Sequence, residues 1–385
     1  MKVIMATNLY PPYARGGSER VARLSAEAWV RAGHQVVVLT AAPFSGAPSL
    51  LPKRVVESGL VVYRWFPLNL YFYAEAATKP VALRLVWTFF DVFNIHSYLI
   101  ARWVLHKEQP DLVVSHNLKG LGYTLARACA RGSWRYIHVL HDVQLAYPTG
   151  VLYPATSARE LSRWSVRIYM AVNRWLFRRV LAVVAPSKFL LDFYRSLNFF
   201  PQAETRRLLN PVAAQPNVSV PHSGINIVFF ELELHKGLDV LLEVWQSVTD
   251  QDVMFHLAGG GSQTHYAAEH VQGEARVRMF GRLSAEENEA LWSTADIVVA
   301  PSLCLENSPT VIAEALARGV YVIASNVGGV PELAALSRSV RLIPPGDVAA
   351  LAQALQDTIS TVRNGVRPAV VALPNPDEYI QALSR

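Results

Sequence analysis

The chain has 385 residues, of which 51% are hydrophobic and 17% are charged, so it can build a large core over two domains of ordinary size. Its two cysteines, Cys129 and Cys304, lie in separate halves, which argues for a reducing compartment and against a disulfide framework or a cysteine metal site. The net charge of +6 comes with no recognised nucleic-acid motif, so we expect no nucleic-acid partner.

The chain opens with a strand, a glycine loop and a helix. Residues 2–6 have the apolar pattern of a buried strand, and Gly16 and Gly17 precede a helix predicted over 20–32. The next strand is predicted over 35–39, so the order is that of a βαβ unit. Glycines let the backbone approach a ligand closely, and the start of the helix can face a phosphate. The loop is therefore a candidate binding loop.

Residues 60–108 are rich in aromatic side chains and are predicted to be helical in their second half. The longest apolar run, 86–105, is interrupted by Asp91 and Arg102, so it is a poor transmembrane span. The N-terminus also lacks the long apolar region of a signal peptide. We therefore expect a cytoplasmic protein, peripheral on the inner face of the cell membrane at most. The aromatic residues are interpreted either as packing of a helical insertion or as a surface that faces an acceptor or a membrane.

Two histidines directly follow or end predicted strands of the first half. The strand predicted over 111–117 contains His116 near its end, a helix is predicted over 120–131, and the strand over 135–140 is followed by His141. A lone histidine at a strand end is more often structural than functional. Here, however, both histidines follow strands of one parallel sheet, where ligands bind at the carboxyl edge. His141 is therefore the first candidate for a site residue, and His116 is the second.

A basic segment runs from Arg159 to Arg179, where arginines alternate with aromatic and aliphatic residues. Such a segment can lie on an anionic membrane surface. It can equally be a solvated helix face on which the arginine stems cover apolar surface. The residues leave both interpretations open.

The pattern predicts two α/β domains joined by a linker. Residues 213–224 hold two prolines and show no apolar periodicity, so they are interpreted as the linker between a domain over 1–212 and a domain over 225–362. The tail over 363–385 ends in a short predicted helix that can pack back on the first domain. Two such domains imply a cleft whose closure excludes water.

The most informative stretch runs over residues 300–332. A strand ends there in a loop that carries Glu306, and Asn307 or Ser308 is predicted to cap the helix that follows. Glu314 lies about one turn into that helix. At this edge of an open sheet the carboxylates can accept hydrogen bonds from hydroxyls of a sugar or ribose, and the helix start suits an anion. The alternative is a solvated Glu306 and a Glu314 that only favours the helix dipole.

This stretch resembles a known family. The pattern from Glu306 to Glu314, with 328–332 behind it, is similar to the E-x7-E region of retaining family 4 glycosyltransferases of the GT-B fold. Further motifs follow in the order of that family, and they are Pro11-Pro12 to Gly16-Gly17-Ser18-Glu19, His141-Asp142, Pro186-Ser187-Lys188, Asn210-Pro211-Val212, Lys236-Gly237 and Phe280-Gly281. The resemblance therefore extends through most of the chain.

The resemblance implies an α/β protein of the GT-B fold, with two Rossmann-like parallel-sheet domains facing a central cleft. It also implies transfer of a sugar from a nucleotide-sugar donor to a glycan or lipid-linked acceptor, with retention of anomeric configuration and with no metal or other cofactor. The expected products are cell-surface polysaccharides or glycoconjugates. Carried over by position, the implied catalytic residues are His141, Lys236 and Glu306, and the implied donor-binding residues are Gly16, Gly17, Lys236, Glu306, Asn307, Ser308 and Glu314.

Each of these residues has an implied role. Gly16 and Gly17 would approach the donor diphosphate, and Lys236 would pair with its phosphates. His141 would lie near the transferred sugar and the acceptor. The sugar hydroxyls would be held by Glu306 with backbone at Asn307 and Ser308, and the ribose by Glu314.

Glu231 departs from the family pattern. The family usually shows Gly-Arg-Leu before the Lys-Gly pair, and its arginine binds the diphosphate, whereas this chain has Phe230-Glu231-Leu232. An acid beside a diphosphate is repulsive. Either Glu231 points away and another arginine substitutes, or the activity is weakened, or the donor differs. A catalytically weakened GT-B binding protein is therefore the alternative function, and a GT-B sugar-nucleotide epimerase fits the motifs less well.

Overall fold

The computed structural model describes residues 1–14, 16–213 and 220–385, and it forms two compact units. Unit 1 comprises Met1–Gly150, Ser157–Pro211 and Pro374–Arg385, and unit 2 comprises Val151–Thr156 and Val212–Leu373. Residues 214–219, half of the predicted linker over 213–224, lie outside the described residues. The short segment Val151–Thr156 joins unit 2, although it lies inside the sequence range of the first predicted domain.

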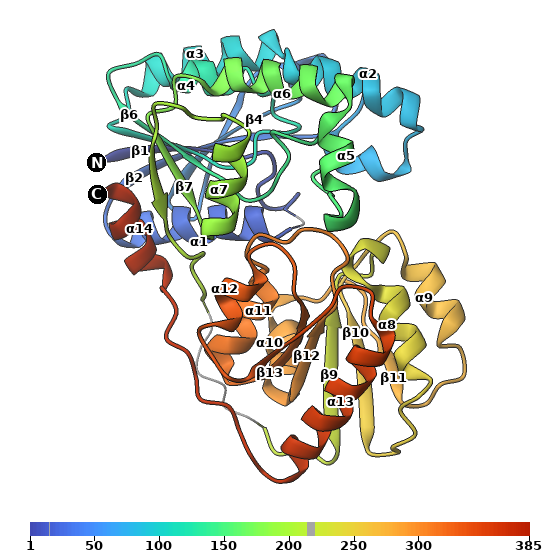
Figure 1. The fold of residues 1–385 in the computed structure, drawn as a ribbon. Coiled ribbons are helices and arrows are strands. Elements are labelled where there is room, and N and C mark those ends of the chain that lie inside the picture. The colour runs from blue at the N-terminus through green and yellow to red at the C-terminus, as the bar shows by residue number, and fades with distance from the viewer. Residues whose placement is uncertain (15, 214–219) are drawn as a thin grey trace. The chain divides into compact units, whose positions relative to one another are not determined.

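Unit 1 is built on an eight-stranded sheet in the order β3-β4-β2-β1-β5-β6-β7-β8 (Figure 1). Its strands are β1 (Lys2–Ala6), β2 (Gln35–Ala41), β3 (Lys53–Glu57), β4 (Leu60–Trp65), β5 (Leu112–Ser115), β6 (Arg135–Val139), β7 (Ala182–Ala185) and β8 (Glu204–Arg207). All neighbours are parallel except β3 and β4, which form a hairpin. The two-residue turn at Ser58 and Gly59 has φ values of 49° and 79°, which match the twist of a hairpin. Sequence reasoning did not predict this hairpin.

The helices of unit 1 cover both faces of its sheet. They are α1 (Gly17–Arg31), α2 (Val81–Val92), α3 (Ile95–Glu108), α4 (Leu125–Cys129), α5 (Ser157–Ser162), α6 (Trp164–Phe177), α7 (Lys188–Ser196) and α14 (Pro376–Ser384), with short 3-10 helices η1 (Ala47–Leu50) and η2 (Tyr73–Thr78). Figure 1 shows α1 and α14 on one face and α3, α4 and α6 on the other. The predicted helix pair in the aromatic-rich region is α2 and α3.

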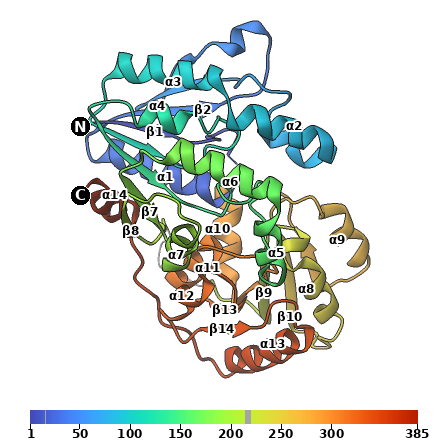
Figure 2. The same ribbon diagram turned by 45° about the horizontal axis from the view of Figure 1, so that its top comes forward.

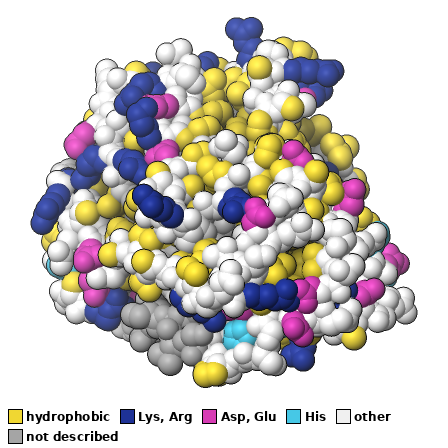
Figure 3. Space-filling model, turned by 60° about the horizontal axis from the view of Figure 1, so that its bottom comes forward, with side chains coloured by type: hydrophobic (Ala, Val, Ile, Leu, Met, Phe, Trp, Pro, Cys, Tyr) yellow, Lys and Arg dark blue, Asp and Glu magenta, His cyan; other side chains and the backbone are white. Residues whose placement is uncertain are grey.

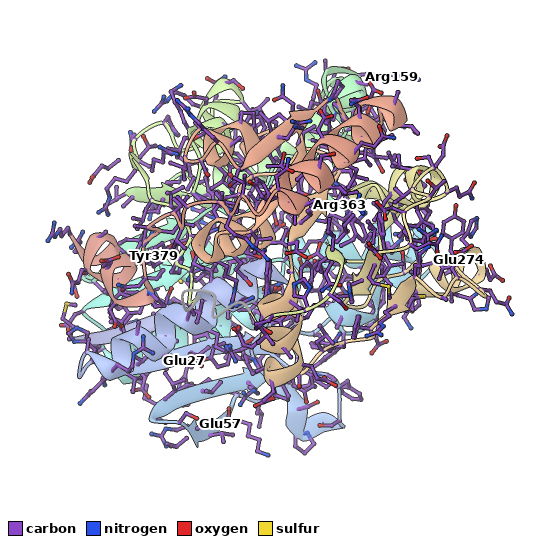
Figure 4. The ribbon with its side chains drawn as sticks, turned by 90° about the horizontal axis from the view of Figure 1, so that it is seen from below. Glu27, Glu57, Arg159, Glu274, Arg363 and Tyr379 are labelled. Carbon is purple, nitrogen blue, oxygen red and sulfur yellow. The ribbon has the colours of Figure 1, made fainter. Side chains whose placement is uncertain are left out.

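The C-terminal helix α14 belongs to the core of unit 1. Tyr379, Ile380 and Leu383 are buried in the same apolar cluster as side chains of β1 and α1. Arg31 of α1 donates to Asp377 of α14 at 2.8 Å, and Figure 4 shows Tyr379 beside α1. Burying each aliphatic side chain is worth about 1.5–3 kcal/mol, so the tail adds substantially to the stability of this unit.

Unit 2 has a six-stranded parallel sheet in the order β11-β10-β9-β12-β13-β14. The strands are β9 (Ile225–Phe230), β10 (Val253–Ala258), β11 (Val277–Met279), β12 (Ile297–Ala300), β13 (Tyr321–Ser325) and β14 (Val340–Ile343). The helices are η3 (Pro154–Thr156), η4 (Leu234–Lys236), α8 (Leu238–Trp245), α9 (Thr264–His270), α10 (Ala285–Thr294), α11 (Thr310–Arg318), α12 (Val330–Ala334) and α13 (Val348–Arg363). This strand order is that of a doubly wound sheet, in which the order of the strands reverses between β9 and β12.

Two helix boundaries differ from the prediction. The helix expected over 120–131 is shortened to α4, because Gly120 and Gly122 have φ values of 93° and 110° and the chain before Leu125 turns instead. Helix α11 begins at Thr310 with Pro309 in the cap position and no side-chain cap. The prediction that Asn307 or Ser308 caps this helix is therefore wrong.

Among the described residues, no helix is long and apolar enough to cross a bilayer. Figure 3 shows basic, acidic and apolar side chains interspersed over the face that it draws. The basic excess of the chain is therefore not gathered into a single area on that face.

Candidate functional site

In unit 2, three loops meet at the carboxyl edge of the sheet, near the point between β9 and β12 where the order of the strands reverses. The loop after β9 bonds to the loop after β12, because the amide of Leu303 donates to the carbonyl of His235 at 2.9 Å. The loop after β13 joins them, since the amide of Gly329 donates to the carbonyl of Glu306 at 2.8 Å. In open α/β sheets this reversal point is where ligands bind. Glu306, which sequence reasoning assigned to sugar hydroxyls, and Glu231, which it placed beside the diphosphate, both lie on these loops.

Lys236 lies between these two glutamates. Its Nζ is 2.8 Å from Glu306 Oε1 and 3.0 Å from Glu231 Oε2, and the hydroxyl of Ser302 donates to Glu306 at 2.9 Å. Burial by itself would lower the pKa of Lys236, but the negative charges of Glu306 and Glu231 outweigh it and raise that pKa. The lysine is therefore a fixed cation. Residues 231 and 306 are brought together here although 75 residues separate them, because β9 and β12 are neighbours.

Glu231 is turned towards Lys236 rather than away from it. It follows β9 directly and has a φ of 66°, in the left-handed region that costs a side chain of this type roughly 1 kcal/mol or more. Its side chain is half-exposed, whereas that of Glu306 is largely covered. Of the three alternatives left open for Glu231, the one in which it points away is not met, because its carboxylate contacts Lys236.

Two glycines allow the loops to approach one another. A Cβ at Gly237 would lie 2.1 Å from the carbonyl oxygen of Pro301, and one at Gly328 would lie 2.0 Å from that of Glu306. Both glycines also have positive φ, 82° and 56° respectively. The position of Lys236 and of Glu306 therefore depends on glycine at these two points.

The other predicted donor-binding residues of unit 2 lie on the same loop and helix. Asn307 is buried on the loop after β12, Ser308 is half-buried beside it, and Glu314 is buried in α11. The first backbone N–H groups of α11 lie at this end of the helix, where the dipole favours an anion. Within the described residues there is no group of three or more His, Cys, Asp or Glu side chains that could hold a metal ion.

In unit 1, the predicted glycine loop follows β1 at the reversal point between β1 and β5, and His141 follows β6, the strand next to β5. Helix α1 begins at Gly17, and the side chain of Glu19 accepts from the amide of Gly16 at 2.9 Å. Asn117, at the end of β5, donates to Ser18 at 3.3 Å and to Asp142 at 2.9 Å. The side chain of Asn117 thus connects the glycine loop to the residue that follows His141.

His141 forms a pair with the second histidine candidate. Nδ1 of His116 lies 2.8 Å from Nε2 of His141, and the two rings stack with centroids 5.1 Å apart. Burial lowers the pKa of His141 to about 4 and, together with the nearby histidines, lowers that of His116 well below its usual value. Both rings are therefore neutral at pH 7, and the N–H of one ring donates a hydrogen bond to the unprotonated nitrogen of the other. Burial also raises the pKa of the adjacent Asp142 to about 6.

Asp91 is a buried carboxyl that sequence reasoning did not single out. It lies in α2, and both of its oxygens accept from the amide of Gly120, at 2.9 and 3.0 Å. Burial raises its pKa to about 7, although the bond from Gly120 and the charge of Lys119 oppose this. A signal for it was present in the sequence, since it is the single acid among the mostly apolar residues of α2.

We expect Asp91→Asn to stabilise the protein in a pH-dependent way. The folded pKa of about 7 exceeds the ordinary value of 3.8, so the aspartate favours the folded state below pH 3.8, and this contribution is lost as the pH rises to about 7. The full difference corresponds to at most about 4 kcal/mol. The gain in the free energy of unfolding of the variant, measured by urea denaturation, should therefore grow from pH 4 to pH 7 and then level off. The exposed Asp192→Asn serves as control, and a gain that does not vary with pH would contradict the prediction.

The predicted site residues thus form two sets. Gly16, Gly17 and His141 lie in unit 1, while Lys236, Glu306, Asn307, Ser308 and Glu314 lie in unit 2. Within each unit the residues come from loops at the carboxyl edge of the sheet. The residues that sequence reasoning missed are Asn117 and Asp91, and it did not foresee that Glu231 pairs with Lys236.

Two family models match the chain. The model described as glycosyl transferases group 1 matches residues 226–361, and the model described as a glycosyl transferase 4-like domain matches residues 16–211. Together they cover most of both units.

Curated relatives match over much of the chain. A Klebsiella pneumoniae protein from the cps region is 23% identical over 86% of this chain and 87% of its own length. A glycogen synthase of Mycobacterium tuberculosis is 26% identical over 93% of this chain and 86% of its own. A phosphatidyl-myo-inositol mannosyltransferase of Mycobacterium leprae is 29% identical over 38% of this chain and 39% of its own.

Solved structures share the fold. A sucrose-phosphate synthase from Thermosynechococcus elongatus superposes with a TM-score of 0.69 at 18% identity, covering 100% of this chain and 95% of that one. The Anabaena protein Alr3699/HepE, solved with UDP and glucose, has a TM-score of 0.64 at 17% identity, with 100% and 94% covered. These likenesses, with the two parallel-sheet units, confirm the predicted GT-B fold.

Proposed function

The chain belongs to the glycosyl transferases group 1 family and is a glycosyltransferase, and from this premise we propose that it moves a sugar from a nucleotide-sugar donor to a glycan or lipid-linked acceptor, with retention of anomeric configuration. The products we propose are cell-surface polysaccharides or glycoconjugates. This destination is supported by the relatives, one of which comes from a cps region and another of which carries phosphatidyl-myo-inositol in its name.

The observation that carries the proposal is the position of Lys236. Its ammonium group is held at the reversal point of a nucleotide-binding sheet, at the same edge as the N-terminus of α11. When a glycosidic bond to a diphosphate breaks, negative charge grows on the leaving oxygens and positive charge on the sugar. A fixed cation and the backbone N–H groups at the start of α11 stabilise a departing diphosphate, so these groups of unit 2 suit that step without a metal ion.

The remaining site residues have roles that follow from their charge. Glu306 positions Lys236 and has a second carboxylate oxygen with which to accept from a sugar hydroxyl. Glu314, a buried acid of α11, is proposed to accept from the ribose. His141 is neutral at pH 7, so it would act through hydrogen bonds to the transferred sugar and acceptor rather than as a cation.

A direct test measures the release of nucleoside diphosphate when the protein is incubated with UDP-, GDP-, ADP- and dTDP-sugars. The thermal shift of the protein is measured with each of the same donors. Turnover with one of them is expected, and the anomeric configuration of the product, read by NMR, tests retention. Absence of both turnover and thermal stabilisation with every donor would refute the proposal.

The second candidate function is a GT-B protein that binds its ligand without efficient turnover. It is favoured by one observation, the half-exposed carboxylate of Glu231 beside Lys236. Under this alternative, Glu231 partly neutralises the lysine and repels the donor diphosphate. Its prediction is binding of a nucleotide-sugar, seen by calorimetry, with little release of nucleoside diphosphate.

We expect Glu231→Gln to lower the donor KM by about fivefold, since one negative charge at about 4 Å in water is worth about 1 kcal/mol. Calorimetric titration with the preferred donor measures the same change as a Kd. The exposed Glu243→Gln on α8 is the control and should leave KM unchanged. An increase in KM, or loss of activity, would mean instead that Glu231 takes part in the reaction, and Glu231→Arg would then fail as well.

A further inference from the structure

Helix α2 of unit 1 is unusually exposed for an apolar helix. Of its twelve residues only Trp87, Asp91 and Val92 are buried, and every residue from 81 to 86 is exposed. A helix that is apolar on most of its circumference is normally covered by protein or lipid. The exposed apolar side chains of α2 and of the turn after it are Val81, Leu83, Leu85, Val86, Phe89, Phe90 and Phe93.

Neighbouring segments extend this apolar surface. Helix α3 exposes Ile95, Leu99 and Trp103, which recur every four residues and so lie on one side of the helix. The exposed Leu68 and Leu70 are also close, because Asn94 donates to the carbonyl of Leu68 at 3.2 Å. We call the exposed apolar side chains of 68–70, α2 and α3 the apolar face.

A cluster of arginines lies beside the apolar face. Helix α4 packs against both α3 and α6, and the three helices lie side by side in Figures 1 and 2. Arg127 of α4 stacks on Trp175 of α6 at 3.8 Å, and Arg131 donates to Tyr98 of α3 at 2.6 Å. Burial and the charges of the nearby arginines lower the pKa of Arg127, and these neighbours are Arg178, Arg131 and Arg179.

We propose that the apolar face docks on a lipid bilayer that contains anionic phospholipid, with side chains of α2 entering the acyl region and Arg127, Arg131, Arg178 and Arg179 contacting headgroups. This inference rests on the proposed function and deepens it, because it places the enzyme on the surface that carries a lipid-linked acceptor. It also goes beyond the sequence-based interpretations, which offered membrane contact for the arginine-rich segment and for the aromatic-rich region as a whole, because it assigns the contact to the exposed side chains of α2 and α3 and to the arginines beside them.

Charge favours lipid over a second copy of the chain. Between residues 80 and 107 the cations are Arg84, Arg102 and Lys107, whereas the single acid, Asp91, is buried. Two copies that met through this face would bring cations towards cations. An anionic bilayer instead offers an apolar interior for the leucines and phenylalanines and negative headgroups for the cations around them.

Flotation of the full chain with vesicles tests the proposal. The wild type is expected to float with vesicles of phosphatidylcholine and phosphatidylglycerol, and less with phosphatidylcholine alone.

The double variant Leu85→Ser/Phe89→Ser should bind the anionic vesicles at least ~10-fold more weakly, because both exposed side chains lose their burial in lipid. The double variant Arg178→Gln/Arg179→Gln should lose roughly fivefold in affinity for the anionic vesicles for each arginine removed, and its binding should depend less on the sodium chloride concentration. The matched control is Leu51→Ser/Val56→Ser, exposed apolar residues outside the apolar face, and it should float like the wild type.

The proposal is overturned if the wild type does not float, or if Leu85→Ser/Phe89→Ser floats equally well. It is also overturned if light scattering shows a dimer that this variant converts to a monomer while neither protein binds vesicles, since a second copy would then cover the face. Donor binding, measured by thermal shift on the same samples, distinguishes failure of the docking proposal from failure of the proposed function. A protein that binds a nucleotide-sugar but no vesicles refutes the docking alone, and one that binds vesicles but no donor refutes the proposed function alone.

Discussion

Lys236→Met is expected to reduce nucleotide-sugar turnover by at least ~100-fold. The substitution keeps an apolar stem of similar length but removes the ammonium group that lies 2.8 Å from Glu306 and 3.0 Å from Glu231. Two carboxylates are then left at the proposed diphosphate site without their cation. They repel the donor in the ground state and repel the leaving diphosphate more strongly as its charge grows. Initial rates of nucleoside diphosphate release over a range of donor concentrations measure the loss in kcat and in KM.

The control for this experiment is Lys188→Met, which removes an exposed lysine of unit 1 that pairs with Asp192. It should retain wild-type kinetics, because a surface ion pair contributes at most about 1 kcal/mol to stability and none to the site. The thermal midpoint of Lys236→Met should be recorded as well, so that a loss of activity is not confused with unfolding. Wild-type turnover by a folded Lys236→Met protein would remove Lys236 from the proposed mechanism.

Gly237→Ala is expected to lower the free energy of unfolding by about 3 kcal/mol or more and to weaken donor binding with it. The added Cβ would lie 2.1 Å from the carbonyl oxygen of Pro301, which is backbone and cannot rotate away. The loop after β9 must therefore move from the loop after β12, and Lys236 moves with it. Urea denaturation gives the change in stability, and thermal shift with the donor gives the change in binding.

Gly273→Ala is the control that measures the cost of the left-handed backbone alone, without the clash that a Cβ at position 237 makes with Pro301. Gly273 has a φ of 84°, almost the same as the 82° of Gly237, but a Cβ there would meet nothing within 4 Å. Its substitution should cost only about 1–2 kcal/mol, the strain of the left-handed region, and should leave donor binding unchanged. Equal losses in the two alanine variants would mean that the approach of the loops is not what requires glycine at 237.

The sequence by itself determined the repeating strand and helix pattern and the places where loops bind ligands. Buried parallel strands are covered on both faces, so β12 is an uninterrupted apolar run, and β1 and β9 are apolar except for Lys2 and Asn226. Glycines and polar residues directly after such runs mark the carboxyl edge of the sheet. Glu306 and His141 could therefore be placed at such an edge from local pattern alone.

Only the tertiary structure decided which of these residues meet. Lys236 pairs with Glu306 because β9 and β12 are neighbours in the sheet, and strand order does not follow from the pattern of either strand. The same holds for Asp91, whose carboxyl becomes buried against the amide of Gly120 across 29 residues of sequence. Glu231 is the clearest case. Its sequence position suggested a repelled phosphate, but the structure gives it a left-handed backbone and places its carboxylate 3.0 Å from Lys236, which Glu306 of the neighbouring loop also contacts.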